Sequence, residues 1–230
     1  MNHDLRALGG EAGSANVASS PLSPVVDHAL LPHVRPAVIM LLLFTLLTGL
    51  VYPLAITIIA QVAFPARANG SLVTTNGKIV GSRLIGQPFS SDRYFQPRPS
   101  ATNAPDPKDA TKTIDAPYNA ANSGGSNLGP TSKLLHDRVA ADVTKLKAST
   151  GTVIVPADSV TTSGSGLDPH ISPAFALLQI ARVARARHLP EDKLRRLVQD
   201  HIEAPSLGVF GEPEVNVLGL NLALDALPAA

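Results

Sequence analysis

The sequence has no cysteine and no tryptophan, and aromatic residues make up only 4% of its 230 residues. The absence of cysteine excludes disulfide bonds, thiolate catalysis and metal sites with cysteine ligands. Lysine and arginine (19 residues) nearly balance aspartate and glutamate (18 residues), so the composition lacks the basic excess that marks nucleic-acid-binding proteins. With so few aromatic side chains, a hydrophobic core must be built mainly from alanine, leucine, valine and isoleucine.

Motifs for nucleotide hydrolysis are also missing. A Walker A loop needs four residues between its first glycine and the Gly-Lys pair, which Ser or Thr then follows. The nearest match, Gly70 with Gly77-Lys78, has six intervening residues and is followed by Ile79. The phosphorylation sequence D-K-T-G-T does not occur either. We therefore expect that this chain is not an enzyme and does not hydrolyse nucleotide by itself.

The longest feature that is present is an uncharged apolar stretch from Ala37 to Phe64. A helix needs about 20 apolar residues to cross a bilayer, and the polar residues here are scattered without forming a charged face. We predict a transmembrane helix over residues 35–64. The alternative is a cleaved signal peptide, because Ala66-Arg67-Ala68 has the form of a cleavage site. The apolar run is about twice the usual length for such a peptide.

Four residues of this stretch share one helical face at i, i+4 spacing: Thr45, Gly49, Pro53 and Thr57. The ring of Pro53 presses on the carbonyl of Gly49, the smallest residue available. Small residues at this spacing let another helix approach closely. The spacing fits two interpretations, a docking face for partner transmembrane helices or a tolerated kink in a lone anchor.

On either side of the predicted span lie two regions of different character. Residues 1–34 are rich in Ala, Ser, Gly and Pro without periodicity, which predicts a disordered tail. Residues 65–230 suffice for one compact domain with its own core. Near the span, Arg35 on one side faces three basic residues on the other, which favours an internal C-terminus, but this rule weakens for long domains. Charge therefore leaves the side of the domain open.

The region after the span reads as one soluble α+β domain. Asn76-Gly77 separates Ser71–Thr75 from Lys78–Ile85, which is the strongest short signal for a β-hairpin. Gly86–Pro130 is rich in Pro, Gly, Asn and Ser and predicts a long loop with few regular elements. Its residues Tyr94, Phe95 and Arg98 either pin the loop to the core or serve function. Thr152–Val155 predicts a short buried strand.

About four helices are expected in this domain. Thr131–Ala148 has an apolar stripe at helical spacing. Ser172 is placed as an N-cap before Pro173 at the first helical position. In that helix we expect Leu177, Ile180, Ala181 and Ala184 to face the core and Gln179, Arg182 and Arg185 to lie on the opposite side. The remaining helices are predicted over Glu191–Glu203 and, after the cap Asn216, over Val217–Leu227.

Candidate catalytic groups are sparse. Ser165, Asp168 and His170 are the residue types of a hydrolytic triad, and a membrane-anchored hydrolase using Ser165 and His170 is one alternative function. Three members within six residues rarely align, however, and Asp168-Pro169 is a natural turn. We expect no metal site, because the histidines after residue 130 show no i, i+4 ligand pair. These histidines are His136, His170, His188 and His201.

A glycine-serine loop precedes these residues: Ser163, Gly164, Ser165 and Gly166. Successive backbone N–H groups in such a loop can cradle an anion, and the serine hydroxyls can add contacts. The loop also loosely resembles the signature loop of ABC-type ATPases. Equally, it can be a connector that leads the chain into the Ser172 cap. The sequence alone leaves both interpretations open.

Several longer strings carry a more specific resemblance: RPAVIMLLLFTLLTGLVYPLA, GSRLIGQPF, YFQPRPSA, SGGSNLGP, VTTSGSGLDPHISP and EPEVNVLGLNLALDAL. In order and spacing they closely resemble the KdpC subunits of bacterial high-affinity potassium-transporting Kdp ATPases, over about residues 35–227. The resemblance implies a single-pass, non-catalytic subunit of an inner-membrane complex. Its implied partners are a channel-like potassium-binding subunit, a P-type ATPase subunit that takes the aspartyl phosphate, and a small helical subunit.

The resemblance also implies a role, that of a catalytic chaperone raising the ATP affinity of the ATPase subunit. On that view ATP is shared with the ATPase subunit, and the candidate contacts are Ser163, Gly164, Ser165, Gly166 and Gln179. The family architecture, however, implies a periplasmic soluble domain, whereas ATP is cytoplasmic. Such a domain could act on ATP only by coupling through its helix. The alternative is an extracytoplasmic scaffold or ion-entry cover without nucleotide contact.

Overall fold

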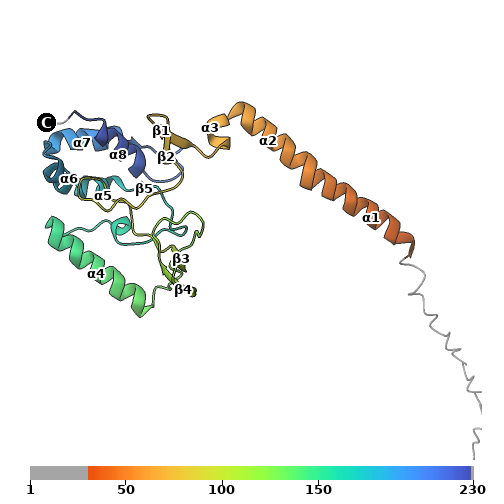
Figure 1. The fold of residues 1–230 in the computed structure, drawn as a ribbon, viewed down its shortest axis with the longest axis horizontal. Helices are drawn as coiled ribbons and strands as arrows, with labels where there is room; N and C mark the ends of the chain where they lie inside the picture. The colour runs from red at the N-terminus through yellow and green to blue at the C-terminus, as the bar shows by residue number, and fades with distance from the viewer. Residues whose placement is uncertain (1–30, 229–230) are drawn as a thin grey trace, which may run out of the picture. The chain divides into compact units, whose positions relative to one another are not determined.

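The computed structural model describes residues 31–228 (Figure 1). The chain divides into two compact units, one ending at Ile58 and one beginning at Ile59. A disordered tail is predicted over residues 1–34. Residues 1–30 of it lie outside the described residues, and its last four residues belong to the first helix. The prediction of an apolar N-terminal helix followed by an α+β region is confirmed.

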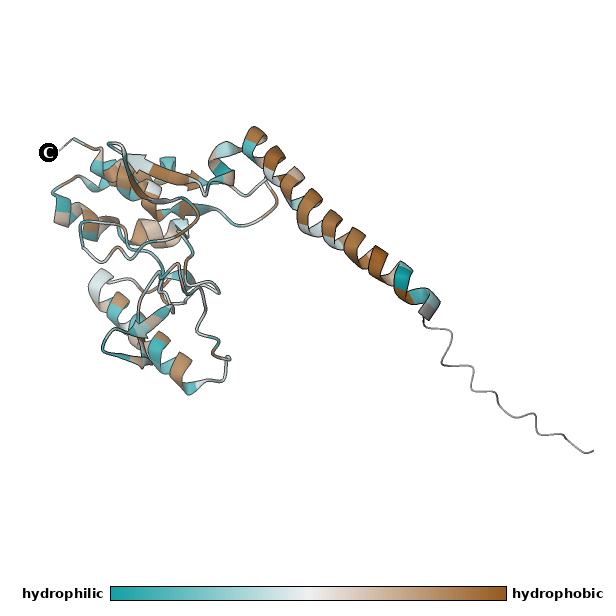
Figure 2. Ribbon diagram, turned by 45° about the vertical axis from the view of Figure 1, so that its right-hand side comes forward, coloured by the Kyte–Doolittle hydropathy of each residue, from teal (hydrophilic) through white to brown (hydrophobic). Residues whose placement is uncertain are grey.

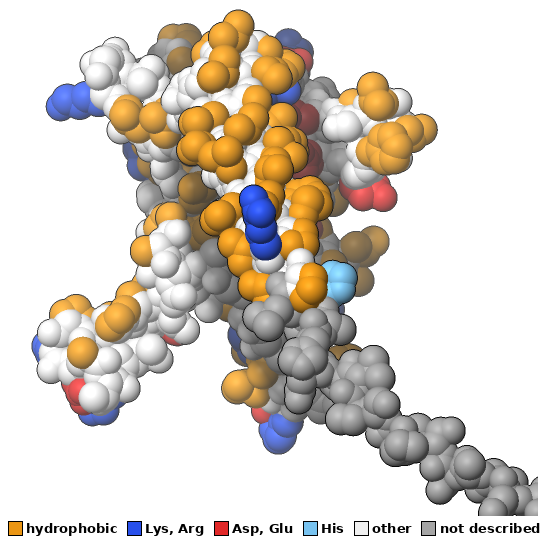
Figure 3. Space-filling view, turned by 90° about the vertical axis from the view of Figure 1, so that its right-hand side faces the viewer, with side chains coloured by type: hydrophobic (Ala, Val, Ile, Leu, Met, Phe, Trp, Pro, Cys, Tyr) orange, Lys and Arg blue, Asp and Glu red, His pale blue; other side chains and the backbone are white. Residues whose placement is uncertain are grey.

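The apolar helix is built from two α-helical stretches joined by a π turn. They are α1 (Leu31–Leu46), the π turn Leu47–Val51 and α2 (Tyr52–Ala63). From Pro32 to Ala63 the helix is long and apolar enough to cross a membrane. Hydrophobic residues predominate along it beyond its N-terminal end (Figure 2), and the face of it seen in Figure 3 is mostly covered by hydrophobic side chains. A short helix, α3 (Pro65–Ala68), follows.

The core of the domain is formed by helices and one small sheet from the C-terminal third of the chain. The helices are α5 (Pro173–Leu178), α6 (Ile180–Arg187), α7 (Glu191–Asp200) and α8 (Val217–Asp225). The antiparallel sheet has the order β5 (His170–Ile171), β7 (Glu214–Asn216), β6 (Ile202–Glu203). The buried cluster is mostly aliphatic, as the composition requires, and includes two phenylalanines, Phe95 and Phe175.

The predicted hairpin after the span is confirmed. Strand β1 (Leu72–Thr75) pairs antiparallel with β2 (Lys78–Ser82). Asn76 and Gly77 have φ values of 51° and 75°, the positive angles that the tight two-residue turn demands.

The long loop predicted over Gly86–Pro130, with few regular elements, contains a short second hairpin, β3 (Asn103–Asp106) with β4 (Asp109–Asp115), which the prolines and aspartates around its turn conceal. One strand prediction is wrong. Thr152–Val155 forms no strand, and the side chains of Val153 and Ile154 are 84% and 82% exposed. A β-branched run becomes a strand only where a partner strand is available.

The helix predictions hold with corrected ends. Helix α4 (Lys133–Thr150) begins at the cap Ser132 and presents its apolar stripe half-buried, with no residue fully buried. Its C-terminal half lines one hollow together with Phe175 and Arg182 of the core helices (Figure 1). Ser172 and Asn216 cap α5 and α8 as predicted, each accepting a backbone N–H of the first turn. Helix α7 ends at Asp200 rather than at Glu203, which belongs to β6.

Candidate functional site

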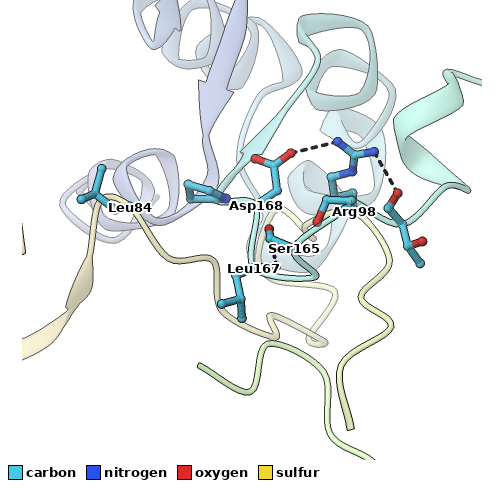
Figure 4. Close-up of a pocket in the computed structure, with 9 residues that line it drawn as sticks. Leu84, Arg98, Ser165, Leu167 and Asp168 are labelled. Carbon is cyan, nitrogen blue, oxygen red and sulfur yellow. Dashed lines mark hydrogen bonds and ion pairs between the residues drawn. The ribbon is translucent and has the colours of Figure 1, made fainter. Parts of the chain in front are cut away.

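The glycine-serine loop borders an open hollow of about 610 Å³ (Figure 4). Ser163, Gly164 and Ser165 line the hollow, whereas Gly166 does not. The remaining wall is contributed by Leu84, Arg98, Thr162, Leu167, Asp168 and Pro169. The structure thus brings three of the five predicted nucleotide contacts to one surface.

The polar groups of this loop are largely paired with one another. The Ser163 hydroxyl accepts the N–H of Gly166 at 2.9 Å, and the Ser165 hydroxyl accepts the N–H of Leu167 at 3.1 Å. Side-chain turns of this kind hold serine-rich loops in shape. The carbonyl of Ser165 accepts the N–H of Gly124 at 2.9 Å. The N–H groups of Gly166 and Leu167 therefore already have partners, whereas the hydroxyls of Ser163 and Ser165 accept in these bonds and keep their own protons to donate.

Gly166 is required by packing. Its φ is 68°, and a Cβ added to it would lie 2.5 Å from Cγ2 of Thr102 and 2.7 Å from the carbonyl oxygen of Gly124. Gly164 differs, because a Cβ there meets no atom within 4 Å. At Gly166 the backbone of the glycine-serine loop therefore packs directly against Thr102 and Gly124.

Arg98 and Asp168 form an ion pair on the wall of the hollow, with 2.8 Å between Nη1 and Oδ2 (Figure 4). The Tyr118 hydroxyl donates to the carbonyl of Arg98 at 2.6 Å. Burial raises the pKa of this hydroxyl above its usual value, and the charge of Asp168 adds to the effect. The other carboxylate oxygen of Asp168 accepts the N–H of His170 at 3.0 Å, as expected of an Asp-Pro turn.

The structure does not assemble Ser165, Asp168 and His170 as a triad. The imidazole Nδ1 of His170 lies 3.7 Å from Asp168 Oδ1, but Nε2 lies 3.3 Å from Nδ2 of Asn216. In the described part of the chain, no hydrogen bond joins Ser165 to His170; the serine hydroxyl instead accepts the N–H of Leu167. A serine nucleophile needs its base within hydrogen-bond reach, and this arrangement does not supply one.

A group that the sequence did not reveal comprises His170, Glu203 and Glu214, whose donor atoms lie within 4.8 Å of one another. Strand register explains the group, because Glu203 pairs with Glu214 and His170 pairs with Asn216, which puts the three side chains on one face. The signal was hidden because Glu203 was assigned to a helix.

The hydrogen bonds around this group set its chemistry. The Asn216 side-chain oxygen accepts the N–H of Gly219 and its Nδ2 donates to the carbonyl of Arg83, so the orientation of the amide is fixed. Nε2 of a neutral His170 must then accept from that Nδ2, which puts the ring proton on Nδ1, 3.5 Å from a Glu214 oxygen. Glu203 is paired with Arg83 at 3.0 Å. A metal ion bound at Nδ1 of His170 would therefore have to displace this proton, and one bound by Glu203 would have to compete with Arg83.

Gln179 lies elsewhere, and its predicted position on the exposed side of the helix is wrong. The side chain is buried, its oxygen accepts the N–H of Gln96 at 2.7 Å, and its nitrogen donates to the carbonyl of Gln96 at 3.0 Å. The oxygen also accepts from Arg182 at 2.6 Å. Gln179 borders a different hollow, beside α4, so the structure does not bring it to the glycine-serine loop.

Asn221 makes the same pair of hydrogen bonds with the backbone of Phe95, the residue before Gln96. Its oxygen accepts the N–H of Phe95 and its nitrogen donates to the carbonyl of Phe95, both at 2.9 Å. The segment Tyr94–Gln96 has no regular secondary structure, yet its backbone groups are paired as they would be in a sheet. Arg182 donates to the carbonyls of Tyr94 and Asp92. Burial lowers the pKa of Arg182, and the Asp92 carboxylate opposes this change.

The π turn alters the predicted packing face of the membrane helix. The N–H of Tyr52 donates to the carbonyl of Leu47, five residues earlier. A π turn holds more residues than an α turn, so Thr45 moves out of line with Pro53 and Thr57. Gly49 lies within the turn, and a Cβ added there would meet no atom within 4 Å. π turns often mark functional positions.

The described residues define a membrane-anchored protein with one candidate span and one small α+β domain. The family model "KdpC: K+-transporting ATPase, c chain" matches residues 34–226. Relatives named potassium-transporting ATPase KdpC subunit occur in Methylobacterium nodulans (62% identity over 198 residues) and Bradyrhizobium diazoefficiens (59% over 200). These alignments cover 86% and 87% of this chain and 98% and 100% of the relatives. The chain belongs to the KdpC family of potassium-transporting ATPase subunits.

The role of Gln179 is testable by a matched pair of substitutions. We expect Gln179→Ala to lower the free energy of unfolding by about 2–4 kcal/mol, because it leaves the partly buried backbone groups of Gln96 unpaired. Gln199→Ala, at an exposed position of α7, should change it by less than about 0.5 kcal/mol. Urea unfolding of the full chain in detergent, followed by circular dichroism, measures both. Equal stability of the two variants would contradict the assigned role.

The glycine-serine loop offers a second matched pair. Gly166→Ala should lower the free energy of unfolding by about 2–4 kcal/mol, because it combines a positive φ with overlap against Thr102. Gly164→Ala, two residues earlier and in open space, should be nearly neutral. The same unfolding measurement compares them. A neutral Gly166→Ala would show that the loop is not packed as described.

Proposed function

We propose that this chain is a non-catalytic accessory subunit of an ATP-driven potassium-uptake complex, needed for its assembly. It acts as a catalytic chaperone that raises the ATP affinity of the P-type ATPase subunit by coupling between conformational states, without touching the nucleotide. Its partners are the channel-like potassium-binding subunit, the ATPase subunit and the small helical subunit. The chain spans the bacterial inner membrane once, and its domain lies on the periplasmic side.

One observation carries this proposal: the candidate nucleotide contacts are divided between two places and partly committed to the protein's own fold. The N–H groups of Gly166 and Leu167 donate to the hydroxyls of Ser163 and Ser165, and Gln179 is bonded to the backbone of Gln96. A phosphate-binding loop presents unpaired N–H groups to its ligand. Coupling, by contrast, requires only that the subunit contact two states of its partner differently.

A second candidate function is direct contact with ATP. The observation that favours it is the hollow beside Ser163–Ser165, with the guanidinium of Arg98 on its wall. Arginine is well suited to phosphate. Against this stands the ion pair with Asp168 at 2.8 Å, which already neutralises the arginine.

The side of the membrane on which the domain lies separates these two functions. Because the chain has no cysteine, a single Ala148→Cys on the exposed surface of α4 gives an unambiguous signal. We expect a maleimide that cannot cross the inner membrane to label this position in intact cells. Ser23→Cys, before the span, is the control and should be labelled only after lysis. The reverse pattern would place the domain with ATP and overturn the coupling proposal.

Substitution of Ser165 tests the site itself. In the purified potassium-transporting ATPase, we expect Ser165→Ala to change the KM for ATP and the turnover by less than twofold, because the hydroxyl contacts only its own loop. Loss of a direct phosphate contact of about 1.4 kcal/mol would raise the KM about tenfold. A hydrolase that used Ser165 would lose nearly all turnover. A tenfold rise in KM with the domain fold intact would favour the second candidate.

A further inference from the structure

The connection between β6 and β7 exposes an unusual amount of apolar surface. We call Pro205–Gly211 the apolar loop. The side chains of Leu207, Val209 and Phe210 are 90%, 75% and 67% exposed. The chain contains only six phenylalanines, so leaving one of them in water is informative. Large apolar side chains grouped on a surface mark a contact with another molecule more often than scattered ones do.

The loop is folded in a way that keeps these side chains outside. Ser206 and Phe210 exchange backbone hydrogen bonds of 2.9 and 3.0 Å. Between them, Leu207 and Gly208 both have positive φ, 55° and 76°. The left-handed conformation costs a branched residue such as leucine roughly 1–2 kcal/mol relative to the right-handed one. The chain thus holds Leu207 outward at a cost in stability. Strained backbone of this kind is found mostly at functional sites, which fits a role of this loop in contact with another molecule.

The charges around the loop select the kind of partner. The sequence from Leu197 to its end contains no lysine or arginine, whereas Glu203, Glu212 and Glu214 flank the loop. Glu203 is paired with Arg83, but in the described part of the chain Glu212 takes part in no ion pair. Segments that bind membrane surfaces carry lysine and arginine, because the lipid surface is anionic. An acidic flank therefore favours a protein surface with basic side chains.

We propose that the apolar loop is a docking element that inserts Leu207, Val209 and Phe210 into an apolar pocket, rimmed by lysine or arginine, on another subunit of the potassium-transporting ATPase. This inference rests on the proposed function as an accessory subunit. It adds the surface through which the domain, as distinct from the membrane helix, contacts its partner. Glu212 provides the charge that orients the loop on the basic rim.

A cross-linking experiment identifies the occupant. In the intact complex, Leu207→Cys is the only cysteine of this chain and is labelled with benzophenone maleimide. We expect irradiation to join the chain to one other subunit. Ile154→Cys, at an equally exposed apolar position outside the loop, is the control and should give no such product. Products with lipid alone, or with a second copy of this chain, would overturn the proposal.

A dissociation measurement tests the energetic contribution. Asparagine tolerates positive φ, so Leu207→Asn preserves the loop while removing its apolar side chain, and Phe210→Ser is combined with it. We expect this variant to dissociate from the tagged complex at least tenfold faster than wild type, with unchanged domain unfolding. Ile154→Asn should dissociate like wild type. Equal rates for the loop variant and wild type would overturn the proposal.

Deletion of the whole chain separates this inference from the proposed function. If deletion destabilises the complex and the loop variant does not, the docking element is wrong and the accessory role stands. If deletion leaves the complex and potassium transport unchanged, the accessory role itself fails. Glu212→Lys adds a charge test, because it should speed dissociation most at low ionic strength, where the basic rim is least screened.

Discussion

The domain depends on two buried side-chain amides, which hold a segment without regular secondary structure in its centre. Phe95 is fully buried, yet no sheet pairs its backbone. Asn221 of α8 and Gln179, which lies between α5 and α6, supply the missing donors and acceptors. Because an unpaired buried backbone group costs about 1–3 kcal/mol, these two side chains allow a proline-rich loop to fill the core.

This constraint also explains why the predicted nucleotide contacts divide into two places. Gln179 is committed to Gln96, so it cannot serve a ligand beside the glycine-serine loop. The same central loop then continues to Arg98, whose ion pair with Asp168 fixes the start of the sheet that carries His170. Gln179 and the residues beside the glycine-serine loop, which the sequence suggests as one binding site, thus hold two parts of the same central loop in place. A substitution in Gln179 or Asp168 would therefore change the stability of the domain as well as the candidate site.

Local signals were sufficient for much of the fold. The caps Ser172 and Asn216 and the Asn76-Gly77 turn act on their own neighbours, and the structure confirms all three. Features that need a distant partner could not be predicted. Thr152–Val155 has strand propensity but no partner, whereas Glu203 joins a sheet through Glu214. Gln179 looked exposed because helical periodicity cannot show that a central loop covers that side. The candidate site could be predicted only as the local loop Ser163–Gly166.

If the glycine-serine loop does not contact ATP, this chain can change the ATP affinity of the ATPase subunit only through contacts between subunits. Among the described residues, two of the apolar surfaces that the fold leaves exposed are candidates for such contacts. One is the membrane helix, where the π turn at Leu47–Val51 rotates the residues after it relative to those before it. The other is the apolar loop. A ligand shifts an equilibrium only by its differential affinity for the two states. The same holds for a subunit, so a contact that differs between ATPase states at either surface suffices to change nucleotide affinity.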